Sequence, residues 1–189
     1  MIYELIRKNR TIRRYKQNCA PQLSVLKKLV SSAGLCASAA NLQRLRYFLI
    51  REGAPEIYSM LGMGGYLPAE KKPTEKVRPT AYVVILAPED AVDMNIFIDI
   101  GIAAEAITLT AAQEGLGTCM IRNFSKEKLT EYLGCNDYTP QLVIALGYAD
   151  EQVRITGIDD IHGIKYYKDE NDVNVVPKRS LEELIIGIK

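Results

Sequence analysis

Basic side chains at two distant places in the sequence could together bind an anion. Arg10 lies near the start of the chain, and Lys178 and Arg179 lie near its end. Arginine can bond two oxygens of a phosphate at once, and charge-assisted hydrogen bonds are stronger than neutral ones. The hydroxyl of Thr11 could add another donor. The alternative is an ordinary solvated surface, since six of the first sixteen residues are Lys or Arg and such side chains are mostly exposed.

A second stretch could contact a ligand through short polar side chains and backbone amides. It is Ser38-Ala39-Ala40-Asn41-Leu42-Gln43, which follows a predicted helix and precedes a predicted strand. A segment between a helix and a strand need not form sheet hydrogen bonds, so its polar groups can face a ligand. The alternative is a simple connector, because Ser and Asn are common in turns for local reasons.

A third stretch joins a buried helix to a strand. Gly115 and Gly117 are suited to end the helix, and Thr118 to Ile121 has the composition of the strand that follows. The order of these stretches, with a helix between the first two, resembles the nitroreductase-like FMN flavoproteins. The resemblance extends from about residue 4 to residue 185.

This resemblance implies a role for each stretch. It implies that Arg10, Thr11, Lys178 and Arg179 hold the FMN phosphate, and that Arg13 reaches the pyrimidine edge of the flavin, where a cation favours the reduced ring. The remaining residues implied to bind FMN are Ser38, Ala39, Asn41 and Gln43 along the cofactor, and Met120, Ile121 and Arg122, whose backbone would lie near flavin N5. The alternative for Arg13 is a surface salt bridge worth at most about 1 kcal/mol.

The sequence also departs from the family pattern. Many relatives carry an arginine where this chain has Asn9, and Arg44-Leu45 stands where Pro-Trp is frequent. We therefore expect the phosphate to depend more on Lys178 and Arg179, while the substrate side of the site differs from that of relatives.

The function implied by the resemblance is that of an FMN-dependent oxidoreductase. Hydride would pass from NADH or NADPH through flavin N5 to a small acceptor such as a nitro compound or a quinone, with no catalytic side chain. One alternative is a flavin-fragmenting enzyme of the same fold, resembling the enzyme of cobalamin-ligand synthesis. Others are a non-catalytic flavin-binding protein and, from the basic stretch Lys8 to Lys16, a nucleic-acid-binding module.

Composition limits these choices. The chain has 189 residues, 48% of them hydrophobic, which suits one domain over residues 1–189. A formal charge of +1 gives no field that favours nucleic acid or an anionic membrane. The four cysteines form no Cys-x-x-Cys pair, and His162 is the only histidine, so no metal site is expected. No signal peptide or long apolar run is evident, and we expect a cytoplasmic protein.

Apolar periodicity predicts the elements that position these residues. We expect helices over Ile2 to Ile6, from Pro21 to Gly34, from Pro55, from Ser125 and from Ser180, where Glu183 completes a capping box. Strands are expected over Leu45–Ile50, Tyr82–Leu86, Thr118–Ile121 and Leu142–Leu146. The Gly- and Pro-rich segment 62–79 is expected to be a mobile loop.

The helix expected over Asp99 to Glu114 is apolar on nearly every side. Such a helix must be buried, and a one-domain protein has little room to bury it except against a second subunit, so the pattern predicts a homodimer. Together with the resemblance, it implies an α+β, nitroreductase-like three-layer fold with a central mixed β-sheet flanked by helices. A C-terminal strand from residues 164–176 would be exchanged between the subunits.

Overall fold

The computed structural model describes residues 1–51, 54–91 and 93–189. These residues form two compact units. The first holds most of the chain up to Asp150, and the second holds Gly64–Lys72 and Glu151–Lys189. The prediction of one domain over residues 1–189 therefore stays a prediction.

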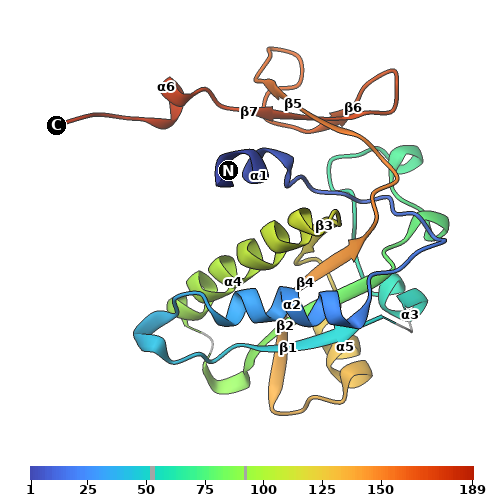
Figure 1. Cartoon of the computed structure of the whole chain (residues 1–189). Helices are drawn as coiled ribbons and strands as arrows, with labels where there is room; N and C mark the ends of the chain where they lie inside the picture. Colours follow the sequence, from blue (N-terminus) through green and yellow to red (C-terminus); the bar gives the residue numbers. More distant parts are fainter. Residues whose placement is uncertain (52–53, 92) are drawn as a thin grey trace. The chain divides into compact units, whose positions relative to one another are not determined.

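The first unit contains a four-stranded sheet with helices on both faces (Figure 1). Its helices and strands are α1 Ile2–Lys8, α2 Leu23–Gly34, β1 Arg46–Ile50, α3 Ala54–Ser59, β2 Ala81–Pro88, α4 Met94–Gln113, β3 Gly117–Ile121, α5 Lys126–Leu133 and β4 Tyr138–Gly147. The four strands predicted from the sequence are confirmed, with β2 and β4 longer at their ends. The second helix begins at Leu23, so Pro21 lies just outside it.

The strand order is β1-β2-β4-β3, and each neighbouring pair is antiparallel. A parallel bridge between Thr11 and Thr118 adds the N-terminal segment beside β3, which makes the sheet mixed. Successive side chains of a strand point to opposite faces. Val83 and Ile85 of β2 therefore enter the core under α2 and α4, whereas Tyr82 and Val84 enter the core on the side of α3 and α5. This is the three-layer α+β arrangement that was predicted.

Helix α4 is the longest helix and lies against the sheet. It begins five residues earlier than predicted because Asp93 is its N-cap and accepts a hydrogen bond from Ile96 N at 2.9 Å. Its buried face includes Ile100 and Ile107. Burial on all sides does not occur within the single chain, since the other face leaves large apolar side chains exposed.

By length and composition alone, α4 is the one helix among the described residues that could cross a membrane. The apolar runs in the sequence are shorter than this helix, because Asp99 and Glu105 interrupt it. Ile100, Ala103 and Ile107 pack in the core, which accounts for the apolar residues of the buried face of α4.

The second unit contains a three-stranded sheet, with β7 between β5 and β6. The elements are β5 Val153–Gly157, β6 Tyr167–Lys168, β7 Asn174–Lys178 and α6 Leu181–Leu184. Strand β5, which was not predicted, pairs parallel with β7, and β6 pairs antiparallel with it. The predicted capping box of Ser180 and Glu183 is confirmed. Both edges of β7 are therefore paired within the chain. Adding β7 to a sheet of another subunit would require one of these pairs to break. The strand exchange stays a prediction.

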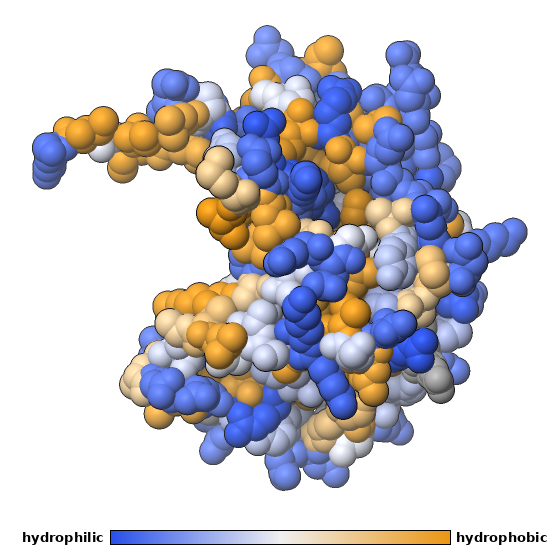
Figure 2. Space-filling view, in the orientation of Figure 1, coloured by the Kyte–Doolittle hydropathy of each residue, from blue (hydrophilic) through white to orange (hydrophobic). Residues whose placement is uncertain are grey.

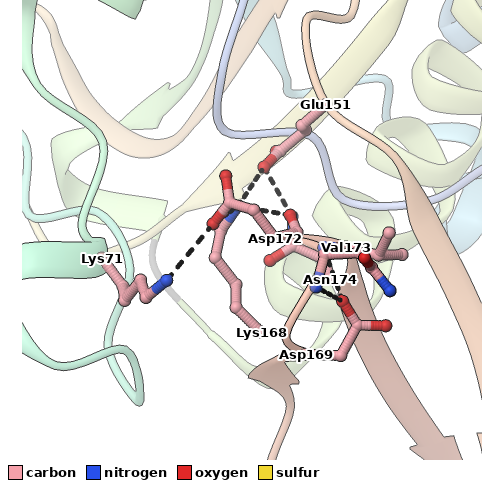
Figure 3. Close-up of polar contacts among 8 residues, drawn as sticks. Lys71, Glu151, Lys168, Asp169, Asp172, Val173 and Asn174 are labelled. Carbon is pink, nitrogen blue, oxygen red and sulfur yellow. Dashed lines mark hydrogen bonds and ion pairs between the residues drawn. The ribbon is translucent and has the colours of Figure 1, made fainter.

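A buried ion pair stabilises the second unit (Figure 3). The side chains of Lys168 and Glu151 are 2% and 3% exposed, with Nζ and Oε2 3.7 Å apart. Lys168 also pairs with Asp172 at 3.1 Å, and Asn174 Nδ2 donates to Glu151 at 2.5 Å. Asp172 in turn lies 3.7 Å from Lys71, which belongs to the segment 62–79. That segment holds two short 3-10 turns, and its mobility stays a prediction.

Candidate functional site

The basic segment after α1 is fixed to the edge of the sheet by its backbone. Ile12 N donates to Thr118 O at 2.8 Å, and Thr11 forms the parallel bridge to Thr118. The segment can lie this close because residue 117 is glycine: a Cβ there would come within 2.7 Å of the Ile12 side chain. Arg10 and Arg13 therefore flank, in sequence, the two residues that are attached to Thr118 of β3.

A buried tyrosine fixes the other end of this segment. Tyr15 is 0% exposed, and its hydroxyl donates to the carbonyl of Ile12. Its ring lies against Gly147, where a Cβ would come within 2.8 Å of the ring. The turn between Ile12 and Tyr15 is thus closed by a buried hydrogen bond, which keeps the half-buried Arg13 in place.

The side chains of this segment face different surroundings. Arg10 Nη2 donates to Ile6 O at 2.6 Å, while its Nε is buried with no hydrogen-bond partner among the described residues. Thr11 is exposed. Asn9, where many relatives carry arginine, donates to Thr108 Oγ1 of α4 at 2.9 Å. Asn9 therefore connects the segment to α4 and supplies no charge.

A groove lies beside the end of β3. Met120 and Arg122 line a groove of about 500 Å³ with Phe97, Gly101 and Ala104 of α4. The intervening Ile121 is 4% exposed and points into the opposite core, as alternation along a strand requires. The Arg122 guanidinium lies 5.7 Å from the centre of the Phe97 ring. Since Thr118 and Met120 share β3, the segment around Arg10 and this groove lie along one strand.

The stretch 38–43 has an unusual backbone. Ala40, Asn41 and Gln43 have φ values of 49°, 54° and 48°, in the left-handed region that costs about 1–2 kcal/mol for a residue with a Cβ. Ser38 Oγ accepts from Gln43 N at 3.2 Å, and Ala39 N donates to Asp99 Oδ1 at 2.9 Å. The stretch is therefore a short 3-10 turn attached to α4.

A separate cavity lies behind this turn. It measures about 170 Å³ and includes Ser38, Gln43, Tyr47 and Asp99 in its lining. Burial raises the pKa of the Tyr47 hydroxyl to about 12, with smaller contributions from Cys36 and Asp99. Asp99 Oδ2 is buried and has no hydrogen-bond partner among the described residues. The lining therefore combines a neutral hydroxyl with a buried carboxyl group.

Lys178 and Arg179 lie in the second unit. Lys178 is the last residue of β7 and is exposed. Arg179 is also exposed and pairs with Glu183 of α6 at 3.2 Å. Sequence reasoning did not anticipate this ion pair, because it used Glu183 only for the capping box.

Within the first unit, the structure brings two of the three predicted groups together. Arg10, Thr11 and Arg13 belong to the segment that pairs with β3, which carries Met120 and Ile121 and is followed by Arg122. The stretch 38–43 lines a different cavity, and it meets α4 at Asp99, whereas Asn9 meets α4 at Thr108. These two points are nine positions apart along the helix, or about 13.5 Å at 1.5 Å per residue.

Comparison with known proteins identifies the family. The sequence profile of the Nitroreductase family matches residues 6–148. The chain belongs to the Nitroreductase family. No curated protein matches it.

Solved structures with the same fold include three bacterial proteins. A nitroreductase family protein from Streptococcus pneumoniae TIGR4 is 16% identical with a TM-score of 0.70, and the match covers 85% of this chain and 96% of that one. An FMN-dependent nitroreductase from Clostridium difficile R20291 is 23% identical, with a TM-score of 0.62 and coverage of 78% and 87%. A protein from Exiguobacterium sibiricum 255-15 in complex with FMN is 16% identical, with a TM-score of 0.64 and coverage of 80% and 89%.

Sequence reasoning missed three residues of this Nitroreductase family member that lie close to the predicted groups. Phe97 lines the groove with Met120, Tyr47 lines the cavity behind the turn, and Asp99 bonds the turn directly. A signal was present for Asp99, which is an acidic residue directly between two apolar ones, Ile98 and Ile100, in a mostly apolar helix. Charged residues are almost never fully buried without a partner, so such a position indicates a specific role.

Proposed function

We propose that this member of the Nitroreductase family is an FMN-dependent oxidoreductase. The chemistry that FMN supplies when bound is hydride transfer at N5, from NADH or NADPH to a small acceptor such as a nitro compound or a quinone. The observation that carries the proposal is the bridge between Thr11 and Thr118, which aligns cationic side chains with a groove at the end of the same strand. The two relatives named with FMN support the same assignment.

The residues present suit the two unlike ends of FMN. The buried Nε of Arg10 has no hydrogen-bond partner in the part of the chain that the structure describes, so the guanidinium keeps a donor for a phosphate oxygen, and Thr11 beside it is exposed. In the groove, Met120, Phe97 and Ala104 offer apolar surface for the ring, while Gly101 leaves open space, since a Cβ there would meet no atom within 4 Å. Backbone groups of Ile121 and Arg122 would donate near N5, and Lys178 and Arg179 would add charge for the phosphate.

We further propose that two copies of the chain complete each site. The stretch 38–43 and Met120 line different cavities, and in this proposal the stretch 38–43 of a second copy reaches the ring. Helix α4 exposes Phe97, Ile98 and Ile102, at 43%, 55% and 38%, and an apolar surface of this kind is typical of an interface. In Figure 2, hydrophobic side chains also gather along the segment after α6, where Ile186 and Ile188 are exposed.

The first experiment tests cofactor binding and turnover. The purified protein, reconstituted with FMN, should be yellow and should bleach when NADH or NADPH is added. Steady-state oxidation of the nicotinamide should then depend on an added nitro compound or quinone. A colourless protein that cannot be reconstituted would refute the proposal. Bound FMN without nicotinamide oxidation would favour a non-catalytic flavin-binding protein, and loss of the flavin under oxygen would favour fragmentation.

The second experiment tests the phosphate residues. The double variant Arg10→Ala with Arg179→Ala should retain FMN at least tenfold more weakly, because each charge-assisted bond is worth about 1.5–3 kcal/mol. The matched control replaces Arg7 and Arg154, where Arg154, like Arg179, forms an exposed ion pair with a carboxylate. Equal retention in the two double variants would refute the assigned role.

The third experiment tests the dimer. Ile98→Glu places a charge on the exposed face of α4 and should shift the protein toward a monomer in sedimentation analysis, with loss of FMN. Ile161→Glu in the second unit is the control, because Ile161 is 86% exposed. An Ile98→Glu variant that stays dimeric would argue against this interface. The cytoplasmic location stays a prediction.

A further inference from the structure

The turn at residues 38–43 holds a backbone conformation that it would not adopt alone. Ala40, Asn41 and Gln43 are left-handed, and none of them is glycine. Strained residues of this kind persist only where the surrounding structure fixes them, and they cluster at functional sites. A group outside the turn must therefore fix them.

Asp99 is the group that meets the turn from α4. Its side chain is 3% exposed, and Oδ1 accepts the hydrogen bond from Ala39 N, the residue immediately before the first left-handed position. A second connection follows the turn, where Arg44 pairs with Asp93, the N-cap of α4, at 3.1 Å. The turn is thus attached to α4 at both of its ends, but the Asp99 contact is partly buried whereas the Arg44 contact is exposed.

The hydrogen bond to Ala39 N uses only one of the two carboxyl oxygens of Asp99. Burying a polar group is unfavourable unless its hydrogen bonds are made, and Oδ2 has no partner among the described residues. The neighbours on the helix, Ile98 and Ile100, are apolar. Perturbed or buried ionisable groups beside a cavity are candidates for a functional role, and Asp99 lines the cavity of about 170 Å³ behind the turn.

We propose that Asp99 is the positioning residue for the turn that contacts FMN. It fixes the Ala39 amide and so keeps the following residues left-handed, which directs Asn41 and Gln43 toward the cofactor. It need not touch FMN itself. This inference rests on the proposed function, since it assigns Asp99 a role in cofactor binding.

The test compares two substitutions at residue 99. Asp99→Ala removes the acceptor, and FMN should bind about tenfold more weakly, which corresponds to about 1.4 kcal/mol. Asp99→Asn keeps a side-chain carbonyl that can accept from Ala39 N, so its affinity should stay within about threefold of the original. Affinity is measured by quenching of flavin fluorescence during titration with FMN.

A second measurement separates positioning from general loss of structure. At saturating FMN, the visible circular dichroism of the flavin should change in Asp99→Ala and be restored in Asp99→Asn. Ser32→Ala is the control, because the Ser32 hydroxyl connects α2 to Ala106 of α4 at 3.3 Å and does not contact the turn. This control should leave both the affinity and the dichroism unchanged.

The outcomes distinguish this inference from the proposed function. If the unaltered protein binds no FMN, both proposals fail. If it binds FMN and Asp99→Ala binds equally well with the same dichroism, only the role of Asp99 is overturned. Should Asp99→Ala not fold, Asp99→Ser replaces it, because the serine hydroxyl lies too close to the backbone to reach Ala39. Full affinity in that variant would likewise overturn the inference.

Discussion

Residues 10–15 and residues 38–43 are both proposed to bind FMN, yet they are fixed in different ways. The first segment pairs its backbone with β3 and buries Ile12 and Tyr15 against glycines. The second has a left-handed backbone and is attached mainly through one buried carboxyl group, Asp99. Packing distributes the constraint over many atoms, whereas the turn depends on a few polar contacts. We therefore expect substitutions in the first region to affect the stability of the whole unit, and those in the second to affect mainly the cofactor.

The largest effect is expected from Gly117→Ala. The new Cβ would lie 2.7–2.9 Å from three side-chain atoms of Ile12, and overpacking of this kind costs about 1–3 kcal/mol. The free energy of unfolding, measured with urea, should fall by that amount, and FMN should bind more weakly because Arg10 and Arg13 shift. Gly157→Ala is the control, since a Cβ there meets no atom within 4 Å. Similar losses in both variants would contradict this account.

Tyr15→Phe should have the next largest effect. It keeps the buried ring but removes the hydroxyl that donates to Ile12 O, which leaves a buried carbonyl without that donor. The free energy of unfolding should fall by about 1–2 kcal/mol. Tyr132→Phe, at a tyrosine that is 40% exposed, should change it little. No loss in Tyr15→Phe would mean that the segment is held by packing alone.

Ala40→Gly should have a small and opposite effect on the second region. Glycine adopts a left-handed conformation without the free-energy cost that it has for alanine. The free energy of unfolding, measured with urea, should therefore rise by less than about 1 kcal/mol. Ala37→Gly is the control. Ala37 is not among the left-handed residues, so this variant should lose about 0.4–1 kcal/mol of stability, because glycine raises the conformational entropy of the unfolded chain. If both variants lost the same free energy of unfolding, alanine would not be strained at residue 40.

The smallest effect concerns pH and the cavity behind the turn. Burial raises the pKa of Tyr47 to about 12, above its value of about 10 in an unfolded chain. The Tyr47 hydroxyl therefore stays protonated to a higher pH in the folded state than in the unfolded chain. The stability that the protonated Tyr47 contributes is complete below pH 10 and is lost as the pH rises toward 12. Tyr47→Phe should therefore reduce the alkaline fall in the thermal midpoint. Part of the fall should remain, because burial also raises the pKa of Tyr82 and Tyr58. An unchanged pH profile would contradict the burial of Tyr47.

The sequence by itself determined most of the elements and the family resemblance. The apolar faces of β2 and the periodicity of α2 and α5 follow from local chemistry, and the Ser180 capping box is a contact between close neighbours. Such signals can be read because the interacting residues are near one another in the chain. The profile match over residues 6–148 agrees with the resemblance found from the basic and glycine-containing stretches.

Only the tertiary structure decided which of these residues meet. It placed Thr11 beside Thr118, directed Asn9 to Thr108, and connected Ala39 to Asp99, which lies 60 positions away. It also revealed β5, which needs β7 as a parallel partner, and the left-handed conformation of Ala40, a residue with no intrinsic preference for it. Each of these features depends on atoms far apart in the sequence, and their free energies arise from burial and hydrogen bonding that no local pattern encodes.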